Sequence, residues 1–180
     1  MIKKIRMVYS NYISDNGEVV TARDFGMATR EEVRKDKKNL KPYPHSKPLG
    51  SFWILDDCSP VNFTPSLQQN LSINVLEDRS GVLVIHDVNE EVTDCPFLPP
   101  PNNAAVFNAD GSLRFVLQNP LTSVPGELNF FRADSVKKEN GEYGLGICIA
   151  VARGQGLECF HVDGTTPDLT TVIRFSKPNI

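Results

Sequence analysis

Four residues with reactive side chains lie close together towards the end of the chain: Cys148, Cys159, His161 and Asp163. Apolar and polar residues alternate on both sides of a turn at residues 153–154, and this pattern predicts a β-hairpin. With a two-residue turn there, Cys148 faces Cys159 across the hairpin and Gly146 faces His161. A turn shifted by one residue would instead place Cys148 opposite His161, so the predicted chemistry depends on the register.

A cysteine beside a histidine has two common uses in proteins. The histidine can accept the thiol proton and create a thiolate nucleophile, and both side chains bind zinc. On this interpretation, His161 and Asp163 form a site with Cys148 or Cys159, and glycines on the facing strand leave room for a ligand. The alternative interpretation is structural, with two small buried cysteines and with His161 hydrogen-bonded to Asp163 or to solvent. A disulfide is disfavoured because we expect a reducing compartment.

Motifs that identify common enzyme classes are absent from the sequence. It contains no GxGxxG or GxxxxGK[ST] phosphate-binding loop, no GxSxG nucleophile elbow and no HExxH zinc motif. His86, followed by Asp87, is a second candidate for acid–base chemistry, although a histidine in such a place is more often the polar end of a strand. The sequence therefore predicts no cofactor and no metal site, and it favours a binding protein over an enzyme.

Charge is distributed unevenly along the chain, whose net charge is −3. Residues 51–113 contain nine acidic residues and a single basic residue, so they carry a net charge of −8, whereas residues 1–50 carry +5. A stretch of this charge attracts basic proteins and repels phosphate groups. It favours a basic protein partner and argues against nucleic acid, unless the lysines of residues 35–38 neutralise it within the folded chain.

The candidate partner-binding residues combine acids of this stretch with one aromatic side chain. Four of the acids lie within eight residues and would form a charged ring: Asp87, Glu90, Glu91 and Asp94. Trp53, the only tryptophan, is followed closely by Asp56 and Asp57. A tryptophan flanked by acids is typical of a binding hot spot, although a core anchor is the commoner role.

Residues 106–114 (VFNADGSLR) and the glycine-rich strands predicted after them resemble segments of small bacterial proteins that lack catalytic motifs. In size, acidity and strand content the chain resembles the immunity proteins of contact-dependent and polymorphic toxin systems. This resemblance implies that an acidic surface occludes the active site of a basic, nuclease-like toxin. That class shares no diagnostic motif, so no residue receives a role by position. A structural role in an assembly such as a virion is a third alternative.

The elements that must position these residues are mainly strands. Alternating residues predict strands over residues 71–76, 113–117 and 145–152, and Asp110–Gly111 predicts a tight hairpin turn. Thr29 begins a capping box, TREE, which predicts one short N-terminal helix.

We therefore expect a single β-dominated domain over residues 1–180, either all-β or α+β. Its expected form is an antiparallel sandwich or partly open barrel of about nine or ten strands. Proline-rich segments near 41–50 and 95–103 predict long loops. No apolar run approaches the ~18 residues of a membrane span, and the N-terminus lacks the apolar core of a secretory signal. These features predict a cytoplasmic protein that does not contact a membrane.

Overall fold

The computed structural model describes residues 3–14, 16–26, 47–63, 71–86, 98–121, 128–150 and 157–171. These residues form strands and turns, and none of them is helical. No helix long and apolar enough to cross a membrane occurs among them. The helix predicted to begin at Thr29 lies outside the described residues.

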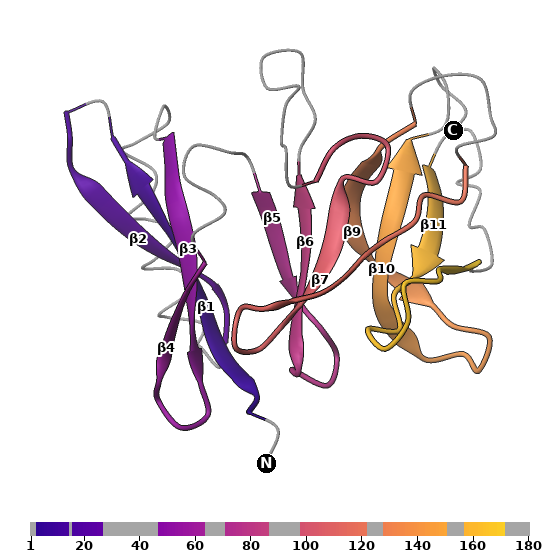
Figure 1. The fold of residues 1–180 in the computed structure, drawn as a ribbon, viewed down its shortest axis with the longest axis horizontal. Helices are drawn as coiled ribbons and strands as arrows, with labels where there is room; N and C mark the ends of the chain where they lie inside the picture. The colour runs from indigo at the N-terminus through magenta and orange to yellow at the C-terminus, as the bar shows by residue number, and fades with distance from the viewer. Residues whose placement is uncertain are drawn as a thin grey trace.

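The strands form three four-stranded antiparallel sheets (Figure 1). The first sheet has the order β2-β1-β3-β4 and contains β1 (Ile5–Ile13), β2 (Val19–Phe25), β3 (Lys47–Leu55) and β4 (Pro60–Phe63). The second has the order β5-β6-β7-β8 and contains β5 (Leu71–Val75), β6 (Gly81–His86), β7 (Ala104–Asn108) and β8 (Leu113–Val116). The third has the order β12-β11-β10-β9 and contains β9 (Phe130–Lys137), β10 (Tyr143–Ala150), β11 (Leu157–His161) and β12 (Thr170–Thr171).

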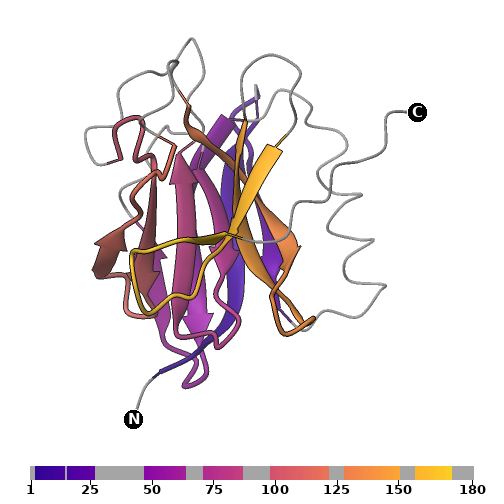
Figure 2. The same cartoon turned by 90° about the vertical axis from the view of Figure 1, so that its right-hand side faces the viewer.

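The second sheet lies between the other two, and both of its faces are buried (Figures 1 and 2). All six residues of β6 are buried, because alternate side chains enter different cores. Val82 and Val84 pack with residues of the first sheet, including Trp53. Leu83 and Ile85 pack with residues of the third sheet. This arrangement explains why β6 is a continuous apolar run, as expected for a strand covered on both faces.

Tight turns at one end of the middle sheet are tied together by the side chain of Arg114. Its Nε donates to Asn108 Oδ1 at 2.7 Å, and its terminal nitrogens donate to the carbonyl oxygens of Ser80 (2.9 Å) and Gly164 (2.5 Å). Gly111, in the turn predicted at Asp110–Gly111, has a φ of +87°, a conformation that favours glycine. These contacts link three turns that are up to 84 residues apart in the sequence, and the predicted hairpin turn is confirmed.

Asn103 connects the middle sheet to the third sheet. Its side chain is fully buried, and its Nδ2 donates to the carbonyl oxygens of His86 (2.6 Å) and Phe130 (2.8 Å). Its Oδ1 accepts a hydrogen bond from the backbone N–H of Phe130 at 2.8 Å. One amide thus satisfies three backbone groups where the chain enters β9.

The prediction of a β-dominated, antiparallel fold is confirmed, but its finer form differs. The described strands form three stacked sheets rather than the two of a sandwich, and they do not close into a barrel. The strands expected near residues 71–76, 113–117 and 145–152 are present as β5, β8 and β10.

Candidate functional site

The β10–β11 hairpin has the register that a two-residue turn predicts. Cys148 pairs with Cys159 and Gly146 pairs with His161. The Val162 N–H donates to the Leu145 carbonyl at 2.9 Å, so residues 145 and 162 are a hydrogen-bonded pair. Because such pairs alternate along an antiparallel ladder, Cys148 and Cys159 fall at a non-hydrogen-bonded position, where opposite Cα atoms lie closest. Their Cα atoms are 4.0 Å apart.

Cys148 and Cys159 form a disulfide. The expectation that a disulfide is disfavoured is therefore wrong, because the register places the two sulfur atoms within bonding distance. In this state neither cysteine has a thiolate to act as a nucleophile or a zinc ligand. Cys58, on the turn between β3 and β4, is a free and exposed cysteine.

The space beside the glycines of β10 is filled by side chains of the chain itself. A Cβ atom added at Gly146 would lie 2.2 Å from Val136 Cγ1. One added at Gly144 would lie 2.4 Å from Glu77 Oε1 and 2.5 Å from Lys138 Cε. Gly146 is therefore required by close packing against Val136, whereas the neighbours of Gly144 are the ends of two long side chains, and Gly144 also lines a groove.

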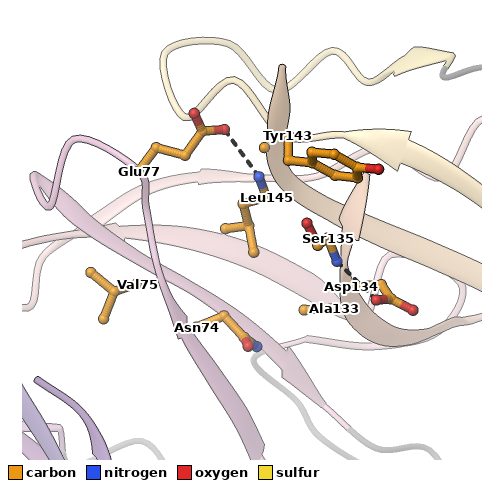
Figure 3. Close-up of a pocket in the computed structure, with 9 residues that line it drawn as sticks. Asn74, Val75, Glu77, Ala133, Asp134, Ser135, Tyr143 and Leu145 are labelled. Atoms are coloured by element: carbon orange, nitrogen blue, oxygen red, sulfur yellow. Dashed lines mark hydrogen bonds between the residues drawn. The ribbon is translucent and has the colours of Figure 1, made fainter. Parts of the chain in front are cut away.

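His161 is paired with Glu77, a residue that the sequence analysis did not single out. Glu77 Oε1 lies 3.2 Å from His161 Nε2. The same oxygen accepts a hydrogen bond from the Leu145 N–H at 3.0 Å (Figure 3). Glu77 Oε2 lies 2.8 Å from Lys138 Nζ. Glu77 follows β5, and its three partners belong to the third sheet or to the turn between β9 and β10, so this carboxylate links two layers. No local pattern could reveal the contact, because 84 residues separate Glu77 from His161.

Asp163, the acid of the predicted site, stabilises a turn. Its Oδ1 accepts hydrogen bonds from the backbone N–H of Thr165 at 3.0 Å and from the Thr165 hydroxyl. Gly164, between them, has a φ of +82°. In place of the hydrogen bond considered between His161 and Asp163, His161 contacts Glu77 and Asp163 contacts Thr165. His86, the second acid–base candidate, is fully buried.

Glu77 is held in its ionised form. Burial raises the pKa of its carboxyl group, but hydrogen bonds from Lys138, Leu145 and His161 outweigh this effect and bring the pKa below its ordinary value of 4.5. A carboxyl group whose pKa is lower in the folded state stabilises the protein above pH 4.5, and this contribution is lost as the pH falls through the folded-state value.

Glu77→Gln is expected to make the protein less stable at pH 7, because glutamine cannot pair with Lys138 as an ion. The difference in melting temperature between the two proteins should shrink as the pH falls from about 6 to about 3. Thermal unfolding followed by circular dichroism at several pH values measures this difference. A difference that stays constant over this pH range would contradict the role of the ionised carboxylate.

A shallow, open groove lies next to this ion-pair cluster (Figure 3). Its volume is about 460 Å³. Residues of β5, β9 and β10 and Glu77 line it: Asn74, Val75, Glu77, Ala133, Asp134, Ser135, Tyr143, Gly144 and Leu145. The groove therefore lies where the edge of the middle sheet meets the third sheet, and it includes part of the hairpin named by the sequence analysis.

The predicted partner-binding residues fall into three groups. Trp53 is fully buried, and its indole N–H donates to the Ala109 carbonyl at 2.6 Å, so this side chain is a core anchor and is not on the surface. Asp56 and Asp57 are both exposed. Asp56 Oδ2 lies 3.6 Å from Arg79 Nη2, and Asp57 Oδ2 lies 2.8 Å from Lys3 Nζ. The remaining four lie outside the described residues: Asp87, Glu90, Glu91 and Asp94.

Within the described part of the chain, no cluster of three or more His, Cys, Asp or Glu side chains is arranged to hold a metal ion. Searches of family models, of curated proteins and of solved structures find no match to this chain.

Proposed function

We propose that the protein is a non-catalytic binding module for a basic protein partner. In its specific form, which the resemblance to immunity proteins implies, the partner is a nuclease-like toxin whose active site is occluded by acidic side chains. The alternative, an enzyme or ligand carrier that uses the 143–163 hairpin, is less well supported.

The observation that carries the proposal is that every reactive group of the alternative site has a structural partner. Cys148 and Cys159 are bonded to each other, and the Asp163 carboxylate holds a turn. His161 lies against Glu77, which Lys138 also contacts. A general base or nucleophile must be free to reach a substrate, whereas these groups hold strands and turns together.

The ion pairs of the described residues indicate which acids are available to a partner. Asp56, Asp57 and Glu77 belong to the negative stretch 51–113, and each lies next to a cation of this chain. Exposed pairs of this kind offset charge locally even though each adds little stability. Of the acids predicted to bind a partner, the proposal assigns the partner-facing charge to Asp87, Glu90, Glu91 and Asp94 rather than to Asp56 and Asp57.

The double substitution Glu90→Lys with Glu91→Lys is expected to slow association with the partner by about tenfold at low salt. It should also flatten the dependence of the association rate on ionic strength. The partner is first captured with the tagged protein at low salt and identified by mass spectrometry. Association rates are then measured by surface plasmon resonance with the purified pair.

A matched control changes the net charge equally at another place. Glu139 and Glu142 lie on the β9–β10 turn and are both exposed. Glu139→Lys with Glu142→Lys should leave the association rate within about twofold of the original protein. Equal slowing by both double substitutions would show a general charge effect and contradict the assignment to Glu90 and Glu91. Recovery of the protein without a stoichiometric basic partner would contradict the proposed function.

A further inference from the structure

We propose that the groove between β5 and the β9–β10 hairpin binds a neutral saccharide ring. This inference goes beyond the proposed function and does not depend on it. It rests on three features of the groove: an exposed aromatic ring at the rim, an apolar floor, and polar side chains whose charges are already balanced.

The exposed ring belongs to Tyr143, whose side chain is 67% accessible although it lines the groove. Tyr143 pairs with Lys137 at the start of β10, so the backbone fixes its position at the rim. A tyrosine offers a flat apolar face and a hydroxyl group to a ligand, and it loses little conformational entropy on binding. The C–H face of a sugar ring is a suitable partner for such a face.

The floor of the groove is apolar because it continues the core-facing side of the third sheet. Leu145 pairs with Ser135, and Ile147 pairs with Ala133, so these four residues share one face. Ile147 is fully buried in the core, and Leu145 and Ala133 pack against the same core. Val75, from β5, borders the groove on its other side, while its side chain packs against the core shared with the first sheet. A ligand that rests here must therefore present some apolar surface.

Polar side chains lie around this floor and can bind hydroxyl groups. Asn74 contributes an amide group, of which Nδ2 already donates to the Ser72 hydroxyl at 3.0 Å. Ser135 contributes a hydroxyl group and Glu77 contributes a carboxylate, whereas Asp134, next to Ser135 on β9, directs its side chain to the opposite face of the sheet. Carboxylate and amide oxygens accept hydrogen bonds from hydroxyl groups, and an amide NH₂ donates to them.

The charge of the groove favours a ligand without charge. The carboxylate of Glu77 has a cation of this chain beside it, because Lys138 Nζ lies 2.8 Å from Glu77 Oε2. A cationic ligand would have to compete with Lys138 for Glu77, and an anionic ligand would have to compete with Glu77 for Lys138. A neutral polyhydroxylated ring needs only acceptors and donors, which the paired carboxylate still supplies.

The shape of the groove agrees with a ring that is part of a longer chain. The groove is shallow and open, so it would leave the two ends of a bound sugar exposed, whereas deep cavities enclose most of a small ligand. Among ligands of this chemistry we therefore expect a terminal or internal residue of a glycan.

The test uses the purified full chain and four simple probes: methyl β-glucopyranoside, methyl β-galactopyranoside, methyl α-mannopyranoside and N-acetylglucosamine. Each is titrated to about 50 mM and followed by the amide chemical shifts of the isotopically labelled protein. We expect at least one probe to give saturable shifts at the Leu145 and Ser135 amides. The absence of saturable shifts with all four probes would overturn the proposal.

Variants at the rim make the test specific. Tyr143→Ala should weaken binding about fivefold, and Tyr143→Phe should retain most of the affinity because the ring face is kept. Val19→Ala, which removes another exposed apolar side chain from the distant edge strand β2, should leave affinity unchanged. Equal affinity of the original protein and Tyr143→Ala would overturn the proposal.

A charged probe decides whether the ligand is neutral. Glucosamine, which carries a positive amino group, should bind no more tightly than N-acetylglucosamine. Binding of glucosamine or of N-acetyl-arginine amide at least about tenfold tighter than that of all four neutral sugars would overturn the proposal and identify a cation site. Loss of sugar binding would leave the partner-capture experiment unaffected, so the two proposals fail independently.

Discussion

Asn103→Ala is expected to lower the free energy of unfolding by about 3 kcal/mol, because three buried backbone groups lose their hydrogen bonds to this side chain at once. The Asn103 amide bonds the carbonyl oxygens of His86 and Phe130 and the N–H of Phe130, at distances of 2.6–2.8 Å. Water cannot replace it freely, since the residue is fully buried. Alanine would leave these groups without hydrogen bonds and open a small cavity.

Thermal and urea unfolding measure this change, which should correspond to a decrease of about 6–12 °C in melting temperature for a chain of this size. Asn103→Asp keeps the acceptor but removes both donors, so it should destabilise the protein as well. Asn62→Ala, on the exposed part of edge strand β4, is the matched control and should change the melting temperature by less than about 2 °C. A melting temperature unchanged by Asn103→Ala would show that the link between the sheets is not formed in solution.

Those parts of the fold that depend on neighbouring residues were predictable from the sequence. Alternation identified β8 and β10, and the Asp110–Gly111 turn is present because glycine adopts the required positive φ. Of the two hairpin registers that the sequence left open, the one centred on residues 153–154 is observed. That register places Cys148 opposite Cys159, but the sequence did not predict the disulfide between them.

Contacts between distant residues were not predictable in the same way. The sequence predicts that His161 contacts solvent or Asp163, two residues away, whereas in the structure it pairs with Glu77, which follows β5 of the middle sheet. Asp163 is near in sequence but is oriented by its own turn. The stacking of three sheets was missed for the same reason. Apolar residues on both faces of β6 indicate burial on both sides, but they do not specify which elements cover it.

The groups considered as catalytic take part in the disulfide, in the Glu77 cluster and in a turn, and these contacts are the observation behind the proposed binding function. The hairpin still contributes to a surface feature, because Tyr143, Gly144 and Leu145 line the groove beside it. The same strands thus place reactive groups in structural roles and an aromatic ring at an open site.

The double substitution Cys148→Ala with Cys159→Ala is expected to lower the free energy of unfolding by about 2–3 kcal/mol. The disulfide closes a loop with a sequence separation of 11 residues, and closing such a loop reduces the conformational entropy of the unfolded chain. Adding a reducing agent should lower the melting temperature of the original protein and leave that of the double variant unchanged. Cys58→Ala is the matched control, because Cys58 is exposed and free, and it should have no effect on melting. If the original protein and the double variant melt together without reductant, the bond does not stabilise the fold, and a count of free thiols in the unfolded original protein then shows whether the bond is formed at all.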